Sequence, residues 1–289
     1  MSGSRFNLVP FQDPKEISSV SKKVRTKKYL EHHGVVTPKT LAFIPANGVN
    51  VNAVLPGDLL DGIPDRFVIK PDPGAMGVDV IILSREGGQY LEPDGTVYPG
   101  EKVLSKTAWI VKANKGLLIE ERVEPHPELA ALSPYGTMPD CRFYCMGNKV
   151  LFAMMRLPTK RSRGYGNLAR GAFPIVSGPD GVTYHSPNFT GSRDSTVHPD
   201  TGVDFNGKKM PLWDAMLPQV LRVPPLFNSP FVCVDGTLDS AGRFVVPEIT
   251  LVPSFTTFLG WDYLLSEFKA NGKKQVNIPI YEFFKLQNL

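Results

Sequence analysis

Residues 67–83 read FVIKPDPGAMGVDVIIL, in which two short apolar runs enclose a turn that contains two prolines and two glycines. This pattern predicts a strand, a loop and a second strand. Lys70 ends the first run, so its ammonium would stand beside the backbone N–H groups of a loop containing Gly74 and Gly77, an arrangement that binds phosphate. A lysine that ends a strand before a proline turn is more often a solvated residue, so this stretch alone leaves both interpretations open.

A second pattern lies further along the chain, where residues 232–250 read VCVDGTLDSAGRFVVPEIT. Two apolar runs across a polar turn predict a hairpin, with Asp235 on its first strand and Glu248 on its second. Thr250 would share a strand face with Glu248, because side chains alternate along a strand. An acid within an apolar strand usually has a partner, and two converging carboxylates suit a magnesium ion that bridges phosphates. The alternative is a hairpin with ordinary polar residues.

A third pattern combines cations with glycines. Arg156 closes the apolar run LFAMMRLPT, and residues 161–172 read RSRGYGNLARGA, which contains Asn167 and Arg170. Cations in such a place could stabilise charge that develops on a transferred phosphoryl group. Taken singly, each arginine is more often part of a basic surface loop.

The other periodic segments predict hairpins with few helices, hence an α+β fold. Residues 174–207 are rich in glycine, proline and polar residues, which predicts a surface excursion. The remaining predicted elements are a helix over Ser21–His33 that stops at Gly34, a strand over Val35–Phe43, a buried strand at Leu117–Ile119 that leads into a linker, hairpins over 141–157 and 231–252, and a helix near Pro211–Leu221.

Composition excludes several classes of protein. The chain has 289 residues, 42% of them hydrophobic, with a net charge of +4, which is typical of a globular protein and too small to indicate a nucleic-acid partner. Neither a membrane-spanning apolar run nor the apolar core of a signal peptide is present, so the cytoplasm is the expected location. Cys141, Cys145 and Cys233 are expected to be reduced, half-buried thiols, and the five histidines show no metal-ligand spacing.

Five ordered blocks together resemble the ATP-grasp superfamily, and most closely its alpha-L-glutamate ligase-like branch, which is related to the ribosomal-protein glutamate ligases. The resemblance covers about residues 23 to 253. The blocks read VIKPDPGAMG (68–77), LIEERVEPHPELAALSPYGTMPDCR (118–142), AMMRLPTKRSRGYGNLARGA (153–172), VHPDTG (197–202) with MPLWDAML (210–217), and VDGTLDSAGRFVVPEITLVP (234–253).

The resemblance implies that two lobes with antiparallel sheets clamp ATP between them. The expected boundaries are an N-terminal lead over 1–20, one lobe over about 35–119 and a second over about 124–289. By position, the implied nucleotide-binding residues are Lys23, Lys70, Gly74, Gly77, Asp140 and the linker backbone of Glu120, Glu121, Arg122 and Val123; the implied catalytic residues are Arg156, Asn167 and Arg170; and the implied magnesium ligands are Asp235, Glu248 and Thr250.

Two positions depart from the family pattern. Thr250 stands where the pattern E-x-N places an asparagine ligand, and Tyr165 stands where relatives commonly have a basic residue, although Arg161 or Arg163 could reach that space. The resemblance begins only about twenty residues into the chain, so the separate domain that usually precedes this fold is not expected here. The acceptor site is therefore expected to be built differently, or to be completed by a partner protein or a second copy of the chain.

The function implied by the resemblance is that of an ATP-dependent, magnesium-requiring ligase. It would form an acyl phosphate on a small-molecule or peptide carboxylate and then an amide with an amine, releasing ADP and phosphate. Two alternatives remain open, namely a small-molecule kinase on the same fold, and a nucleotide-binding protein with reduced or lost turnover.

Overall fold

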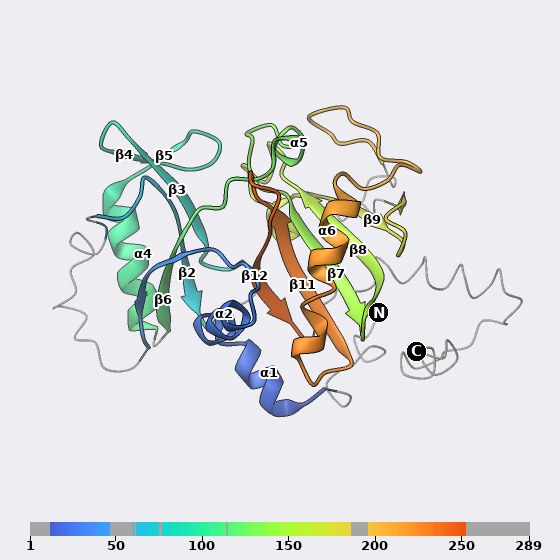
Figure 1. The fold of residues 1–289 in the computed structure, drawn as a ribbon. Helices are drawn as coiled ribbons and strands as arrows, with labels where there is room; N and C mark the ends of the chain where they lie inside the picture. The colour runs from blue at the N-terminus through green and yellow to red at the C-terminus, as the bar shows by residue number, and fades with distance from the viewer. Residues whose placement is uncertain are drawn as a thin grey trace, which may run out of the picture.

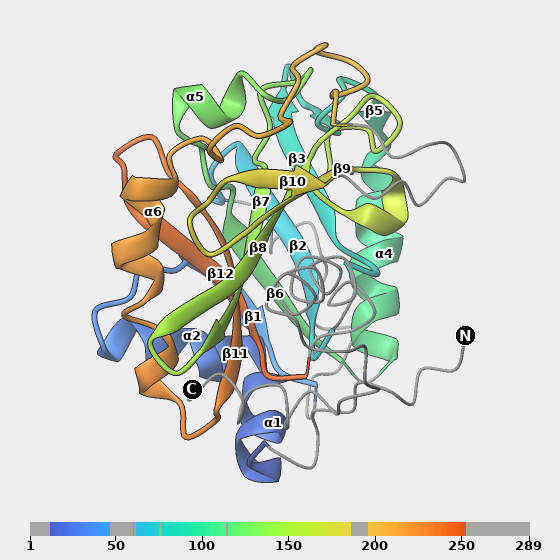
Figure 2. The ribbon, with the colours of Figure 1, turned by 90° about the vertical axis from the view of Figure 1, so that its right-hand side faces the viewer.

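The structure is a computed structural model that describes residues 12–46, 60, 62–74, 77–113, 115–185 and 196–252. Within these residues the chain forms two six-stranded antiparallel sheets, with strand orders β1-β6-β2-β3-β4-β5 and β10-β9-β8-β7-β11-β12. The sheets stand side by side in Figure 1 and one in front of the other in the turned view of Figure 2. We call them, with the helices that cover them, the N-terminal and C-terminal lobes. The predicted α+β class with two antiparallel lobes is confirmed.

Among the described residues of the N-terminal lobe, helix α4 lies on the outer face of the sheet (Figure 1). Side chains alternate along its strands, so Phe67 and Ile69 pack with Val103 and Ile110 of helix α4, whereas Lys70 lies on the opposite face. This alternation places Lys70 on the inner face of the sheet, together with Val68 and Ile82. The lobe consists of β1 (Thr40–Ile44), β2 (Arg66–Asp72), β3 (Ile81–Glu86), β4 (Gln89–Leu91), β5 (Val97–Tyr98), α4 (Gly100–Lys112) and β6 (Gly116–Glu121).

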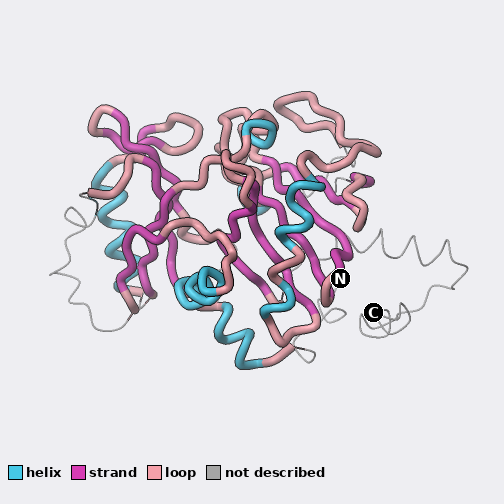
Figure 3. Tube along the Cα trace, viewed as in Figure 1, coloured by secondary structure: helices cyan, strands magenta, loops and turns pink. Residues whose placement is uncertain are grey.

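The C-terminal lobe is built around the two predicted hairpins, which are both confirmed. Its core joins apolar strand residues to Trp213, Met216 and Val220 of α6. The lobe consists of α5 (Pro127–Ala130), β7 (Asp140–Met146), β8 (Lys149–Leu157), η3 (Leu168–Arg170), β9 (Phe173–Ser177), β10 (Thr183–His185), α6 (Trp213–Val220), η4 (Pro224–Leu226), β11 (Phe231–Leu238) and β12 (Phe244–Thr250). Figure 3 shows how strands dominate both lobes.

Two N-terminal helices lie below and between the lobes (Figure 1). The predicted helix is present as α2 (Lys23–His32), and Gly34 follows it with a φ of 72°. Helix α1 (Pro14–Val20) falls within the expected lead and packs against β12. Upstream of it, Gln12 Nε2 donates to the carbonyl oxygens of Phe231 at 2.7 Å and Leu251 at 2.5 Å, which fastens the start of the described chain to its last strands.

Three sequence expectations need correction. The strand expected over Val35–Phe43 begins only at Thr40, because the preceding residues cross between lobes: the carbonyl of Val36 accepts from Val246 N–H, and that of Lys39 from Glu121 N–H. The surface excursion expected over 174–207 begins instead with strands β9 and β10. The sequence did not indicate β9 because a strand that is buried on both faces shows no alternation of apolar and polar residues. The linker expected from Glu120 starts at Arg122, because β6 continues through Glu121.

The three thiols also differ from expectation. Cys141, Cys145 and Cys233 are free, as expected, but they are fully buried rather than half-buried. Burial raises the pKa of the Cys145 thiol to about 12 and that of Cys141 further. No helix among the described residues is long and apolar enough to cross a membrane.

A buried histidine supports the loop that follows β8. His198 Nε2 lies 3.1 Å from the carbonyl oxygen of Pro158, and its Nδ1 lies 3.2 Å from Thr201 N and 3.3 Å from Asp200 N, so the neutral ring donates through Nε2 and accepts through Nδ1. Burial lowers the pKa of His198, an effect that the Pro158 carbonyl opposes only in part.

We therefore expect His198 to destabilise the fold in acid. Its pKa in the folded state lies below the unfolded value of about 6.5, so its contribution is complete above that pH and is lost as the pH falls toward the folded pKa. Chemical unfolding of the native protein and of His198→Gln at pH 8 and pH 5.5 measures this. The native protein should lose more of its free energy of unfolding on acidification than the variant does; equal losses would contradict the assignment.

Candidate functional site

A cavity of about 200 Å³ lies between the inner faces of the two sheets and draws its lining from both lobes. Most of the site residues expected from the sequence line this cavity, although they come from α2, β2, β6, β7, β11, β12 and three loops. Those that line it are Lys23, Lys70, Gly74, Gly77, Glu120, Glu121, Arg122, Val123, Asp140, Asn167, Arg170, Asp235 and Glu248. Arg156 and Thr250 lie outside the lining.

A buried lysine lies on the wall formed by the N-terminal lobe. Lys70 projects from β2, and its Nζ pairs with one carboxylate oxygen of Glu120 on the neighbouring strand β6. The other oxygen of Glu120 pairs with Lys27 of α2. All three side chains are buried, and burial lowers the pKa of Lys27, while the charge of Glu120 opposes that effect. The cluster joins two cations to one anion, so it carries a net positive charge to the cavity.

Helix α2 brings a second lysine to this wall. Lys23 Nζ donates to the carbonyl oxygen of Gly74 and lies 3.2 Å from Glu248 Oε1. Asp72 caps the helix from the adjacent strand, since its Oδ1 accepts from Lys23 N at 2.6 Å and its Oδ2 from Val24 N at 3.2 Å. These bonds hold the start of α2 against the end of β2 and against Gly74. Gly74 and Gly77 belong to the segment between β2 and β3, which we call the glycine loop, and the Lys23 ammonium lies between this loop and the helix.

The wall formed by the C-terminal lobe carries carboxylates that strand register places together. Asp235 lies opposite Glu248 on β12 and opposite Arg142 on β7. Arg142 holds Asp235 with two hydrogen bonds, Nε to Oδ1 at 2.6 Å and Nη2 to Oδ2 at 2.5 Å. Arg156 pairs with Asp140, its cross-strand neighbour, and lies 3.4 Å from Asp235 Oδ2. Arg156 is therefore tied to two residues that line the cavity.

These contacts keep Asp235 ionised. Burial by itself would raise the pKa of the Asp235 carboxyl, but the charge and hydrogen bonds of Arg142, with a smaller contribution from Arg156, outweigh burial and lower that pKa. Glu248 faces the cavity with its side chain 35% exposed.

The two opposed carboxylates fit a magnesium ion. Hard oxygen ligands suit Mg²⁺, and each carboxylate oxygen has two lone pairs, so Asp235 retains coordinating capacity beside its bonds from Arg142. Thr250 shares the strand with Glu248 but lies opposite Cys233, about 7 Å further along the strand at the usual rise per residue. Among the described residues, no group of three or more His, Cys, Asp or Glu side chains could hold a metal ion.

The loop between β8 and β9 closes one side of the cavity. The guanidinium carbon of Arg170 lies 3.9 Å from the centre of the Tyr165 ring, and its Nη2 donates to the carbonyl oxygen of Val80 at 3.0 Å. The Tyr165 hydroxyl accepts from Ile82 N at 3.3 Å and lies 3.3 Å from Glu92 Oε1. A stacked cation and ring thus connect the C-terminal lobe to the strands of the N-terminal lobe.

From the sequence, Arg161 or Arg163 could reach the space that a basic residue at position 165 would fill. Arg163 pairs with the β4–β5 hairpin, where its Nε lies 2.6 Å from Asp94 Oδ2 and its Nη2 lies 2.5 Å from Glu92 Oε2, so it shares Glu92 with the Tyr165 hydroxyl. This ion pair lowers the pKa of Asp94 to about 2, chiefly through its hydrogen bond from Arg163. The cation that stacks on Tyr165 is Arg170.

Gly77 gives a test of how closely the glycine loop meets this closing loop. Its φ is 67°, and a Cβ added there would clash with the Asn167 amide nitrogen. We expect Gly77→Ala to destabilise the fold by about 1 to 3 kcal/mol, because positive φ and steric overlap act together. Thermal and chemical unfolding measure the loss. Gly62 has a φ of 76° with nothing within 4 Å of an added Cβ, so Gly62→Ala is the control for φ alone; equal losses in the two variants would contradict the Asn167 contact.

Sequence reasoning missed Arg142, Lys27 and the role of Tyr165. Arg142 follows Asp140 by two residues on one strand, so both side chains lie on the same strand face, and this spacing could have identified Arg142. Lys27 follows Lys23 by four residues, which places both lysines on one face of α2. No local signal connects Tyr165 to Ile82, because that contact joins the two lobes.

Residues 6–258 match the family model described as sugar-transfer associated ATP-grasp. No curated protein matches the chain. Among solved structures, it is similar to D-cycloserine synthetase DcsG (15% identity, 86% of this chain, 68% of that chain, TM-score 0.49), to D-alanine–D-alanine ligase from Bacillus anthracis (15%, 86%, 63%, 0.47), and to N5-carboxyaminoimidazole synthetase from Staphylococcus aureus complexed with ADP (10%, 87%, 50%, 0.49). The chain thus spans 50% to 68% of the lengths of these three proteins.

Proposed function

The chain belongs to the sugar-transfer associated ATP-grasp family and has the ATP-grasp fold, and from this premise we propose that it is an ATP-dependent, ADP-forming carboxylate–amine ligase. The single observation that carries the proposal is the cavity between the sheets, where the ammonium groups of Lys23 and Lys70 face the carboxylates of Asp235 and Glu248. Cations on one wall suit phosphates, and acids on the other suit the cation that accompanies them. Charges of opposite sign on facing walls are what a phosphoryl-transfer site requires.

The nucleotide would lie along the cavity, with its phosphates at the glycine loop. Lys70, Lys23 and the backbone at Gly74 and Gly77 would bind the phosphates. The linker backbone at Glu121, Arg122 and Val123, together with the end of β6 at Glu120, would read the edge of the base. Asp140 would accept from a ribose hydroxyl, and its Oδ1 is a buried atom with no hydrogen-bond partner among the described residues.

The chain's own residues would contribute position and charge to the reaction. Asp235 and Glu248 would hold magnesium, which when bound neutralises phosphate charge. Arg170 would stabilise the transferred phosphoryl group, and Asn167 would orient it from the loop that meets Gly77. Arg156 would act behind the lining by fixing Asp140 and Asp235. Lys70 and Lys23 would hold the leaving diphosphate of ADP in place.

The reaction would proceed through transfer of the γ-phosphoryl group to a substrate carboxylate oxygen. The resulting acyl phosphate would be attacked by an amine, forming an amide, releasing phosphate and leaving the amine proton to solvent or a base. Because the family is described as associated with sugar transfer, we would test sugar acids and amino sugars beside amino acids and peptides. The resemblance to glutamate ligases adds glutamate.

Two other functions use the same cavity. A kinase would transfer the phosphoryl group to a hydroxyl and release no free phosphate. A protein that binds nucleotide without turnover would release no ADP, and the threonine at position 250 in place of an asparagine is the observation that favours it.

The test is a screen of carboxylates and amines, singly and in pairs, for release of ADP and of phosphate with MgATP. The ligase requires both products to appear in equal amounts and only with a matched pair. Hydroxylamine should trap a hydroxamate with the carboxylate alone. ADP without phosphate would indicate the kinase, and tight nucleotide binding without ADP under every pair would indicate the binding protein.

A further inference from the structure

Lys27 stands behind the cavity wall and not in it. It does not line the cavity, whereas Lys70 and Glu120, with which it forms one cluster, both do. Its Nζ donates to Glu120, to the carbonyl oxygen of Pro38 and, at 2.9 Å, to Thr40 Oγ1. Only 2% of the surface of Lys27 and of Glu120 is exposed, so water screens neither charge.

The geometry gives Glu120 one cation on each oxygen. If Glu120 paired with Lys70 alone, the two charges would cancel, and a phosphate bound in the cavity would experience no net positive charge from the pair. With Lys27 on its other oxygen, Glu120 is neutralised from behind, and the cluster as a whole keeps one positive charge. Coulomb interactions weaken only as 1/r, so a cation one residue behind the lining still acts on a phosphate.

We propose that Lys27 is a positioning residue for nucleotide binding: it holds Glu120 and supplies the positive charge that leaves the Lys70 ammonium available to the phosphates. The inference rests on the proposed function, because it takes Lys70 to be a phosphate ligand. Helix α2 then serves the site twice, through Lys23 at the lining and Lys27 one turn further on. Lys27 touches no ligand itself.

The double variant Lys27→Met, Glu120→Gln distinguishes charge compensation by Lys27 from simple support of the fold. Lys27→Met removes a cation and leaves a neutral Lys70–Glu120 pair, so affinity for MgADP should fall by on the order of tenfold. Adding Glu120→Gln removes the anion as well and restores the net positive charge at Lys70. The double variant should therefore bind MgADP more tightly than Lys27→Met alone. If Lys27 only anchored Pro38 and Thr40, the second substitution would give no recovery.

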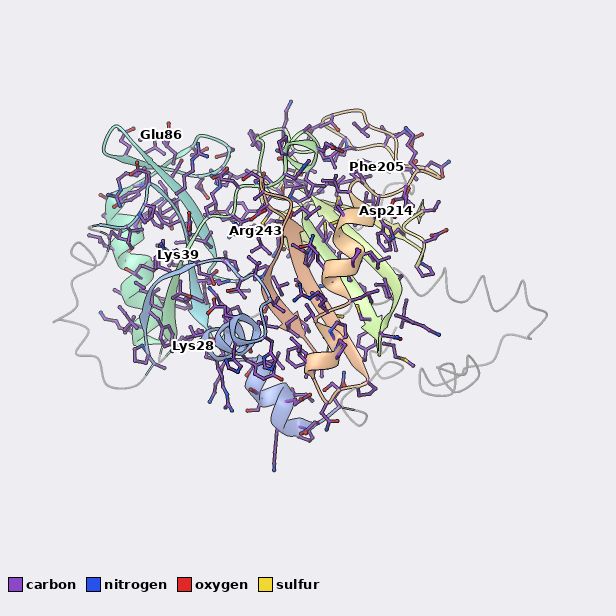
Figure 4. All side chains as sticks on the ribbon, in the orientation of Figure 1. Lys28, Lys39, Glu86, Phe205, Asp214 and Arg243 are labelled. Atoms are coloured by element: carbon purple, nitrogen blue, oxygen red, sulfur yellow. The ribbon has the colours of Figure 1, made fainter. Side chains whose placement is uncertain are left out.

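The experiment is calorimetric titration of the full chain with MgADP, supported by the unfolding temperature of each variant. Lys28→Met is the matched control, because Lys28 is the next residue of α2 and is exposed (Figure 4); its affinity should equal that of the native protein. Lys27→Arg, which keeps the charge, should retain affinity to within about threefold.

Two results would overturn the inference and can be told apart. If the native protein binds MgADP but Lys27→Met binds it equally well, or the double variant shows no recovery, the charge role of Lys27 is wrong while the proposed function stands. If the native protein binds neither MgADP nor MgATP, the proposed function fails and the inference fails with it. Should Lys27→Met not fold, the comparison of Lys27→Arg with Lys27→Gln in the same titration decides the question.

Discussion

Replacing Lys70 by methionine is expected to lower kcat/KM for ATP by a factor on the order of 10² to 10³, or about 3 to 4 kcal/mol of transition-state stabilisation. Methionine keeps most of the length and the apolar stem of the side chain and removes the ammonium group. The loss should fall on both kcat and KM, because an ammonium against the phosphates acts on bound ATP and on the transition state. Initial rates of ADP release over a range of ATP concentrations measure it.

The fold should survive this change. Without Lys70, Glu120 still pairs with Lys27, so no unpaired charge is left buried. Lys149→Met is the control: Lys149 begins strand β8 and its side chain is exposed, so the same substitution there should leave the rate unchanged. If Lys70→Met had the kcat and KM of the native protein, Lys70 would be a strand-ending lysine that does not contact the ligand.

Replacing Glu248 by glutamine is expected to abolish turnover, with a loss of at least about 10³-fold, while the protein stays folded. The amide is nearly the same size as the carboxylate but lacks the charge that a magnesium ligand provides. The affinity of the site for Mn²⁺ in the presence of ADP, measured by electron paramagnetic resonance, should fall in parallel with the rate. That measurement reports the metal even when no substrate pair has been identified.

Two further variants sharpen this test. Glu248→Asp keeps the charge on a shorter side chain, so it should retain part of the Mn²⁺ affinity. Glu86→Gln makes the same substitution at the exposed end of β3, near the outer tip of the N-terminal lobe (Figure 4), and should change neither quantity. Native Mn²⁺ affinity in Glu248→Gln would show that this carboxylate is not a ligand, whatever the rate.

The sequence predicted the parts of the fold whose burial follows a local period. Apolar runs across polar turns indicated both hairpins of the C-terminal lobe, and the glycine after α2 indicated where that helix stops. Helix α4 has no counterpart among the predicted elements because its start, at Gly100, has no side-chain cap, although Val103, Thr107 and Ile110 lie at the spacing of one helix face. Local pattern therefore fails where its start signal is missing.

In the candidate site, too, local contacts could be predicted from the sequence and long-range contacts could not. Asp235 and Glu248 could be paired in advance, since one hairpin carries both and its turn sets their register. The pairing of Glu120 with both Lys27 and Lys70 joins a helix to two strands that are distant in the sequence, so only the packed structure reveals it. Arg170, rather than its neighbours, stacks on Tyr165 because the turn after β8 directs Arg163 to the β4–β5 hairpin.

The attachment of the N-terminal helices to strand β12 has a consequence for synthesis on the ribosome. Val20 and Leu30 belong to the core of the C-terminal lobe, whose last strand follows about 220 residues later, a wait of roughly 10 to 40 s at ordinary translation rates. During that time α1 and α2 lack the last strand against which they pack, so part of their apolar surface is available to a chaperone that acts on nascent chains. Docking of α1 and α2 on β12 therefore comes last although they are made first, and a chain that stops before Phe244 would leave Lys23 without Glu248, while the partners of Lys27 would already be present.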